Sequence, residues 1–320
     1  MHHAVLLNAA KLNFDGGLDF SPLAALSKLT LYPDTTPEQV LERVAGQDIV
    51  ITKEMPIPAD LIRQFPASVR LLCEAGTGYN NIDIEAAREK NIAVCNIPSY
   101  SSGAVAQLVI TYLLNFSSSL LRQQRMLLEK NYDNFTKFLQ VPHFELQGKT
   151  LGLIGGNGAI GREVAKIALA LGMNILVYSR RELSWESPQI RHASLDELLR
   201  QSDFISLHCP LTPDTRYLID EQRLRLMKPS AFLINTARGP LIQEQHLIAA
   251  LQQGIIAGAA LDVQDPEPPS PDNPLFTMDN VILTPHIGWR RLESRQRLIG
   301  LLADNIKAFQ SGAALNVVNK

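Results

Sequence analysis

Three ionisable residues each stand after an apolar segment in the second half of the 320-residue chain. They are Arg238 in NTARG, Glu267 in a proline-rich stretch, and His286 in TPHIGW. Residues that follow strands meet at the carboxyl edge of an open α/β sheet, so these three could converge. There an arginine can bind a carboxylate and polarise a ketone, an imidazole can deliver a proton, and a carboxylate can orient the imidazole. The set predicts reduction of a 2-keto acid, with Arg238, Glu267 and His286 as its catalytic residues.

Reduction of a ketone needs a hydride donor, and a glycine-rich turn predicts that a bound dinucleotide supplies it. The G-x-G-x-x-G pattern lies between an apolar strand pattern, Thr150–Ile154, and a helix pattern, Ile160–Leu171. Such glycines let the backbone turn tightly and approach a pyrophosphate at the helix N-terminus. The expected cofactor contacts are Gly156, Gly158, Ala159, Ile160 and Gly161. Gly155 is one glycine more than the usual spacing needs, so either Gly155 or Gly156 could contact the pyrophosphate.

The end of the next strand pattern bears on the choice of dinucleotide. Ile175–Tyr178 is followed by Ser179, Arg180 and Arg181, where an NAD site usually places an acid for the ribose 2′-hydroxyl. A small polar residue and two cations suit a 2′-phosphate. We therefore expect a preference for NADP(H), with NAD(H) possible.

Composition narrows the class of protein. The chain is 46% hydrophobic and 19% charged with a net charge of −2, which fits a globular protein. It has no block of basic residues of the kind that binds nucleic acid. No apolar run reaches the roughly 20 residues of a membrane span, and the N-terminus lacks the basic region of a signal peptide. Cys73, Cys95 and Cys209 are isolated, which argues against disulfides or a metal site and favours the cytoplasm.

The residues before position 100 alternate between strand and helix patterns, which predicts a parallel sheet flanked by helices. Helices are expected at Ser21–Leu29, opened by Ser21-Pro22, at Thr36–Val44, opened by a capping box, and at Ala59–Phe65 and Asp83–Lys90. Strands are expected at Ala4–Ala9, Leu31–Tyr32, Asp48–Thr52, Val69–Glu74 and Ile92–Asn96.

A long helix is expected over Ser101–Lys130, with an unusually apolar first half. A helix that is apolar on most sides needs cover from more than one surface. It could lie between domains, at a subunit interface, or simply in a core.

Alternation resumes after Lys149 with about six strands, the number typical of a doubly wound dinucleotide domain. The strands are expected at Phe204–Leu207, Ala231–Asn235, Ile256–Val263 and Val281–Thr284, in addition to the two named above. Helices are expected near Leu218–Met227 and at Gln243–Gln253, and a last helix at Glu293–Gln310. Asp265–Pro274 holds five prolines in ten residues and should be a rigid loop.

In the order and spacing of its motifs the chain resembles the D-isomer-specific 2-hydroxyacid dehydrogenase family over essentially its full length. The matching segments are AGTGYNNIDIEAAREKNIAVCNIPSYSSGAVAQ, GKTLGLIGGNGAIGREVA, LHCPLTPDTRYLI, INTARGPLI, GAALDVQDPEP and TPHIGW. The resemblance implies an α/β fold of two doubly wound parallel-sheet domains. A flavodoxin-like substrate domain would comprise residues 1–99 and 290–320, and a Rossmann cofactor domain residues 100–289.

The resemblance also implies roles for further residues. Thr77 and Gly78 would hold the substrate carboxylate through backbone N–H groups. Arg238 would bind and polarise the substrate, His286 would be the acid/base, and Glu267 its partner. Further cofactor contacts would come from Pro210, Thr215, Thr236, Ala237 and Asp262, the last near the nicotinamide amide.

Within the family, Ala106-Gln107 and the ending His286–Trp289 resemble the glycerate dehydrogenase, hydroxypyruvate and glyoxylate reductase branch. Trp289 would narrow the pocket for a small substrate, or it could pack at the hinge. Arg290 could add a cation for the substrate or be surface charge. A D-lactate-type dehydrogenase and a non-catalytic, dinucleotide-sensing corepressor stay open as alternatives. The apolar helix Val105–Phe116 makes a homodimer plausible.

Overall fold

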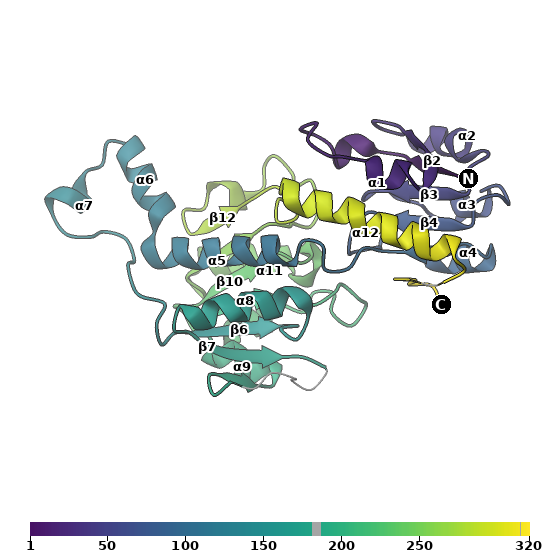
Figure 1. The fold of residues 1–320 in the computed structure, drawn as a ribbon. Helices are drawn as coiled ribbons and strands as arrows, with labels where there is room; N and C mark the ends of the chain where they lie inside the picture. Colours follow the sequence, from purple (N-terminus) through teal and green to yellow (C-terminus); the bar gives the residue numbers. More distant parts are fainter. Residues whose placement is uncertain (181–186, 314) are drawn as a thin grey trace. The chain divides into compact units, whose positions relative to one another are not determined.

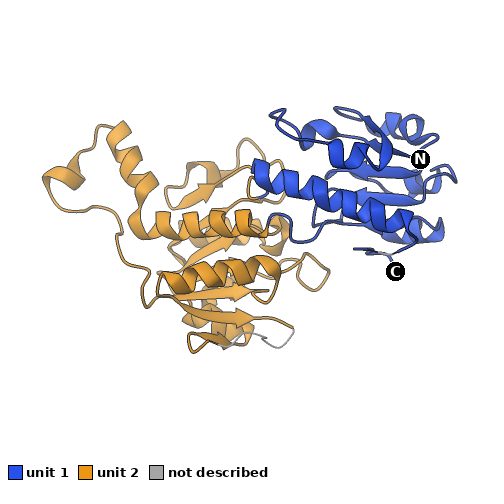
Figure 2. Ribbon diagram, in the orientation of Figure 1, with its two compact units in different colours: residues 1–101, 289–320 blue, residues 102–288 orange. Residues whose placement is uncertain are grey.

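The computed structural model describes residues 1–180, 187–313 and 315–320. Figure 2 shows two compact units, unit 1 made of residues 1–101 and 289–320, and unit 2 made of residues 102–288. These limits differ by no more than two residues from the domain boundaries expected above. Trp289 falls in unit 1, whereas the expected boundaries assigned it to the part that carries the glycine turn.

Unit 1 is built on a five-stranded parallel sheet with the order β2-β1-β3-β4-β5. Its strands are β1 His2–Leu6, β2 Ser27–Leu31, β3 Ile49–Thr52, β4 Leu71–Glu74 and β5 Ala93–Cys95. This is the flavodoxin-like order 2-1-3-4-5. The central strands β3 and β4 are buried at every residue, which explains their nearly continuous apolar sequences.

Successive residues of these strands enter different cores, because side chains alternate across a strand. Ile49 and Ile51 of β3 pack beneath α1, Ser21–Ala24, and α12, Leu292–Gln310. Val50 faces the other way, toward α2 Val40–Val44, α3 Ala59–Arg63 and α4 Ile84–Glu89. Helix α12 therefore completes the core of unit 1 although it lies at the far end of the chain.

Unit 2 is built on a seven-stranded parallel sheet with the order β12-β11-β10-β9-β6-β7-β8. Its strands are β6 Thr150–Ile154, β7 Asn174–Tyr178, β8 Ile190–His192, β9 Phe204–Leu207, β10 Phe232–Asn235, β11 Gly258–Leu261 and β12 Val281–Leu283. The direction of winding reverses between β6 and β9, and ligands of doubly wound sheets bind beyond the strand ends at such a switch point. The predicted α/β class with two doubly wound parallel sheets is confirmed.

Helices cover both faces of this sheet as well (Figure 1). On one face α5, Ser102–Ser118, and α8, Ala159–Ala170, pack over residues such as Leu153 and Ile234. On the other face α9 Leu195–Gln201, α10 Glu221–Leu226 and α11 Glu244–Gln252 pack over residues such as Ile205 and Leu233.

The prediction of one helix over Ser101–Lys130 is wrong. Helix α5 ends at Ser118, Ser119 has a left-handed backbone with φ of 49°, and α6, Leu120–Leu128, leaves at 61° to α5. Most of α5 is buried in the core of unit 2, whereas α6 has no buried residue and, with α7, Asp133–Thr136, projects from the sheet (Figure 1). No single helix among the described residues could cross a membrane, and the bent pair α5–α6 meets only the length and composition criteria.

Two other predictions need correction. The helix expected from Ser21 to Leu29 stops at Ala24, because the following residues pair with β1 as strand β2. Strand β8 was not predicted, since IRH is short and partly exposed at the sheet edge. By contrast, the capping box at Thr36 and Gln39 is present, although it opens a 3-10 turn before α2.

Candidate active site

The glycine turn joins β6 to α8 at the switch point of the seven-stranded sheet. Gly155 has φ of +81°, and a Cβ placed on it would lie 2.6 Å from the backbone nitrogen of Cys209. A side chain there is excluded both by the backbone conformation and by the neighbouring loop. Of the two glycines that the sequence left open, Gly155 therefore makes the tight turn.

Gly156, Gly158 and Gly161 have separate structural roles in the turn. Gly158 is the N-cap residue of α8, so Ala159 and Ile160 form its first turn, where backbone N–H groups suit a phosphate. A Cβ on Gly161 would lie 2.5 Å from the Cα of Gly156, so these two glycines let the helix approach the turn closely. The turn is thus a cradle that side chains would fill, and it fits a dinucleotide pyrophosphate.

The end of β7 lies beside this turn, since β6 and β7 are neighbours in register up to Ile154 and Tyr178. Ser179 follows β7, and its carbonyl oxygen lies 3.2 Å from Nε2 of His192. Arg180 is exposed. Arg181 lies outside the described residues.

The loop after β9 is closed by the hydroxyl of Thr215. Its Oγ1 donates to the carbonyl of Pro210 over 2.7 Å and accepts the N–H of Thr212 over 2.7 Å. Upstream, His208 has both ring nitrogens buried without a partner among the described residues, and burial lowers its pKa to about 4. His208 is therefore neutral near pH 7.

Arg238 leaves a turn at the end of β10 that the Asn235 side chain holds. Asn235 accepts the N–H of Ala237 over 3.0 Å and donates to the carbonyl of Arg238 over 2.8 Å. Gly239 comes next, and a Cβ there would overlap the carbonyl oxygen of Gln264 at 1.8 Å. Only glycine lets the Arg238 loop press against the backbone that leads to Glu267.

Thr236 lies in the same turn, at the end of the buried strand. Its Oγ1 is buried and has no hydrogen-bond partner among the described residues. A buried hydroxyl without a partner is uncommon, and a bound ligand would supply one.

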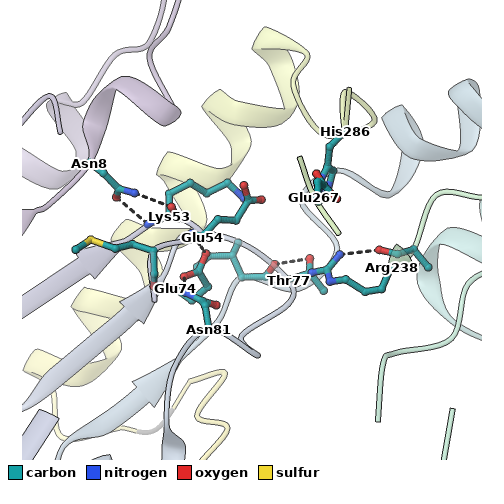
Figure 3. Close-up of polar contacts among 12 residues, drawn as sticks. Asn8, Lys53, Glu54, Glu74, Thr77, Asn81, Arg238, Glu267 and His286 are labelled. Atoms are coloured by element: carbon teal, nitrogen blue, oxygen red, sulfur yellow. Dashed lines mark hydrogen bonds and ion pairs between the residues drawn. The ribbon is translucent and has the colours of Figure 1, made fainter. Parts of the chain in front are cut away.

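His286 and Glu267 form a direct pair (Figure 3). Nδ1 of His286 lies 2.7 Å from Oε1 of Glu267, and the two side chains are 20% and 39% exposed. A carboxylate at Nδ1 fixes the imidazole and leaves Nε2 as the nitrogen that can exchange a proton with a ligand.

The backbone of His286 is in the left-handed region, with φ of 52°. This is rare for a residue with a side chain and persists only where the surroundings impose it. Its N–H donates to the carbonyl of Asp262 over 2.9 Å. The Asp262 carboxylate then accepts the N–H of Ile287 over 2.8 Å, the N–H of Gly288 over 2.9 Å and the hydroxyl of Thr284 over 2.5 Å.

Asp262 therefore organises the loop that presents His286 to Glu267. Burial raises the pKa of Asp262, while the bonds from Thr284, Ile287 and Gly288 and the charge of His286 act in the opposite direction. The sequence suggested a cofactor contact for this residue. Its carboxylate is used to shape the His286 loop, which sequence spacing could not reveal.

In unit 1 the loop after β4 carries Thr77 and Gly78. Thr77 Oγ1 donates to the carbonyl of Ile97 over 3.0 Å, and Asn96 Nδ2 donates to the carbonyl of Thr77 over 2.7 Å. The N–H of Ile97 also donates to Gly76 over 2.8 Å. These bonds fix the loop backbone against the segment after β5.

Comparison with known proteins identifies the family. Residues 110–288 match the model of the D-isomer specific 2-hydroxyacid dehydrogenase NAD binding domain. The hydroxypyruvate reductase of Blautia hydrogenotrophica is 39% identical over 99% of this chain and 99% of its own. This chain belongs to the D-isomer-specific 2-hydroxyacid dehydrogenase family.

Solved structures agree with that assignment. A glyoxylate reductase from Paecilomyes thermophila is 31% identical, with a TM-score of 0.84 and coverage of 99% of this chain and 98% of its own. An acyclic imino acid reductase, Bsp5, in complex with NADPH and D-Arg is 30% identical, with a TM-score of 0.86 and coverage of 98% and 99%. This dehydrogenase is thus an NAD(P)-dependent oxidoreductase.

Sequence patterns missed one charged group of this dehydrogenase, at the carboxyl edge of the unit 1 sheet. It comprises Lys53, Glu54 and Glu74, and Figure 3 shows them with Asn8 and Asn81. The available signal was the charged pair Lys53-Glu54 directly after the apolar strand β3 and the charged last residue, Glu74, of the apolar strand β4.

Trp289, for which the sequence left open a role in the substrate pocket or packing at the hinge, is 6% exposed and packs in the core of unit 1. One face of its ring carries the Lys53 ammonium at 4.0 Å from the centroid. Arg290 is exposed, with its guanidinium 5.9 Å from the same centroid.

Proposed function

We propose that this dehydrogenase uses NADPH to reduce a small 2-keto acid, hydroxypyruvate or glyoxylate, to D-glycerate or glycolate. The observation that carries the proposal is the contact of 2.7 Å between His286 and Glu267 in the unit that holds the glycine turn. The hydroxypyruvate and glyoxylate reductases described above support the choice of substrates.

The proposed roles follow from the chemistry of each side chain. The bound cofactor supplies a hydride to C2 of the substrate. Nε2–H of His286 gives its proton to the carbonyl oxygen, and Glu267 holds the ring and stabilises the charge it carries before transfer. The guanidinium of Arg238 binds the substrate and polarises its carbonyl, and the backbone N–H groups of Thr77 and Gly78 take its carboxylate.

The preference for NADPH rests on the residues after β7. Ser179 and Arg180, with Arg181 next in sequence, stand where NAD-specific sites of this fold place an acid. An arginine pairs well with a 2′-phosphate, and a hydroxyl can donate to it. The complex of the related imino acid reductase with NADPH supports the same preference.

We also propose that the protein is a homodimer formed through the arm of residues 119–140, which comprises α6, α7 and their connection. Several large apolar side chains of this arm are exposed, and no described part of unit 2 covers them. They are Leu120 at 56%, Leu121 at 55%, Leu128 at 84%, Tyr132 at 54%, Phe135 at 77% and Phe138 at 78%. Large apolar side chains exposed together on a projecting arm are typical of a subunit interface.

A panel of 2-keto acids assayed with NADPH and with NADH tests the function. We expect the highest kcat/KM with hydroxypyruvate and glyoxylate, and a higher value with NADPH than with NADH. Highest activity with pyruvate would instead favour a D-lactate-type enzyme. Cofactor binding in a fluorescence titration without turnover of any acid would contradict the proposal and favour the corepressor-like alternative.

A further inference from the structure

The charged group of unit 1 borders the loop proposed to hold the substrate carboxylate. Lys53 directly follows β3 and Glu74 ends β4, two neighbouring strands whose register pairs Thr52 with Glu74. A Cβ placed on Gly76 would lie 3.2 Å from Nζ of Lys53 and 3.1 Å from Oε1 of Glu74. Because Gly76 immediately precedes Thr77, the ammonium lies within reach of a ligand on this loop.

Lys53 is held firmly in place. The amide of Asn8 clamps its backbone, donating to the Lys53 carbonyl over 2.6 Å and accepting the Lys53 N–H over 2.9 Å. Its ammonium lies 4.0 Å from the ring centroid of Trp289 and 2.5 Å from Oε1 of Glu54. A cation placed over an indole ring and paired with one carboxylate has a defined position and direction.

The ammonium is also buried, since the Lys53 side chain is 2% exposed. Burial opposes its charge, but Tyr100, Glu54 and Glu74 keep the pKa of Lys53 above its ordinary value. An apolar side chain of similar size would avoid the cost of burying a charge. Packing alone therefore does not explain why a charged lysine occupies this buried position, and we expect the ammonium to have a further role.

Two features indicate that this use is ligand binding. An ammonium has three N–H donors, and one of them points to Glu54. The indole N–H of Trp289 is buried without a hydrogen-bond partner among the described residues, although the ring is 6% exposed. Glu54, whose side chain is 40% exposed, adds carboxylate acceptors at the rim of the group.

We infer that Lys53 and Glu54 bind the distal part of the substrate and, among 2-keto acids that have a C3 carbon, select those that carry a hydroxyl there. The ammonium donates to the hydroxyl oxygen and the Glu54 carboxylate accepts the hydroxyl proton. A hydroxyl can satisfy both partners of an ion pair, whereas a methyl group satisfies neither and a second carboxylate is repelled by Glu54. The inference rests on the proposed function and deepens it, since it favours hydroxypyruvate over its unsubstituted analogue.

The test compares hydroxypyruvate with pyruvate, which has the same carbon skeleton without the hydroxyl. For Lys53→Met we expect kcat/KM for hydroxypyruvate to fall about tenfold or more, and that for pyruvate to change by less than about threefold. Lys90→Met is the matched control, because Lys90 also belongs to unit 1 and donates to the carbonyls of Arg63 and Phe65. It should change neither value.

Glu54→Gln changes a partly exposed side chain. It provides a second test, a change in substrate preference that would not occur if Glu54 were only structural. Removing the negative charge should raise kcat/KM for oxaloacetate, which carries a carboxylate at C3, about tenfold while it lowers that for hydroxypyruvate. Glu89→Gln is the control, since Glu89 is 62% exposed in an ion pair with Arg63.

The outcomes separate the two proposals. Suppose that the wild-type enzyme reduces hydroxypyruvate and pyruvate, and that the ratio of their kcat/KM values in Lys53→Met and in Glu54→Gln equals the wild-type ratio. This inference is then overturned and the proposed function stands. If the wild-type enzyme reduces no 2-keto acid, both are overturned. Should Lys53→Met fail to fold, the oxaloacetate result with Glu54→Gln decides.

Discussion

At the scale of residues, the proposed acid/base pair of His286 and Glu267 is defined by one contact and one unusual backbone angle. His286 lies 2.7 Å from Glu267 and keeps φ of 52° because Asp262 fixes the following residues. A backbone angle of this kind costs about 1–3 kcal/mol, so it is maintained by a structure that requires the imidazole in this direction.

Removing either member of the pair should abolish most turnover without loss of cofactor. We expect His286→Ala to lower kcat about 10²–10⁴-fold, because the proton donor is lost, and Glu267→Gln to lower it about 10–10²-fold. NADPH affinity in a fluorescence titration should stay within about twofold. His246→Ala is the control, since His246 accepts a bond from the Glu221 N–H in a surface helix; persistent turnover in His286→Ala would refute the assignment.

Arg180 offers a test of cofactor choice. If it binds the 2′-phosphate, Arg180→Ala should raise KM for NADPH about tenfold or more and leave KM for NADH nearly unchanged, because a bond to a charged group is worth about 1.5–3 kcal/mol. Arg200→Ala, at an exposed arginine paired with Asp196, serves as the control. Equal effects on both cofactors would show that Arg180 is ordinary surface charge.

At the scale of elements, the loops after the strands place the site, and glycines decide how closely those loops approach. Gly155 brings the β6 turn against the backbone after β9, and Gly239 brings the β10 loop against the backbone after β11. Tyr112 of α5 adds a contact of 2.5 Å with Thr284, which also donates to Asp262. The buried half of the broken helix thus supports the His286 loop.

The end of β4 should make stability depend on pH. Burial raises the pKa of Glu74 to about 7 from 4.5, although Lys53 and the bonds from Glu54 and Asn81 oppose the shift. Between about pH 4.5 and 7 folded Glu74 therefore keeps a proton that the unfolded chain has lost. The free energy of unfolding falls as pH rises through this window, by at most about 1.4 kcal/mol per pH unit from this group.

Glu74→Gln should remove that contribution. Because the glutamine amide can accept only one of the two bonds made to Glu74, the variant should also be about 1 kcal/mol less stable at pH 5. Urea unfolding at several pH values from 5 to 8 measures both effects, with Glu89→Gln as an exposed control. An unchanged pH dependence would contradict the raised pKa.

At the scale of the whole molecule, unit 1 is built from the two ends of the chain, residues 1–101 and 289–320. Helix α12 completes the core of unit 1, and Asn319 near the C-terminus donates to the carbonyl of Ile92 beside β5 over 2.8 Å. The arm of residues 119–140, by contrast, leaves unit 2 with its apolar residues exposed.

The arm should control assembly. If it forms the dimer interface, Phe135→Asp together with Phe138→Asp should give monomers in sedimentation velocity at concentrations where the wild-type protein is dimeric. The reason is that burying two carboxylates in an apolar interface is costly. Phe276→Asp is the control, because Phe276 is 50% exposed in unit 2 outside the arm; a dimeric arm variant would place the interface elsewhere.

The sequence by itself determined the class of fold, the family and the family's motif positions. Apolar strands alternating with capped helices specify parallel sheets through local patterns. The glycine turn and the segments around Arg238, Glu267 and His286 can be recognised because their chemistry depends on short stretches of chain. Interruptions within an element were harder to predict from the sequence, as the kink between α5 and α6 at Ser119 shows.

Only the tertiary structure decided how residues from different strands meet. It assigned the tight turn to Gly155, made Asp262 the centre of the His286 loop, and joined Asn8, Lys53 and Glu74 in one buried group. The physical reason is that these contacts depend on strand order and on close packing between loops. Residues 45 positions apart, such as Asn8 and Lys53, become partners only when β1 and β3 lie side by side.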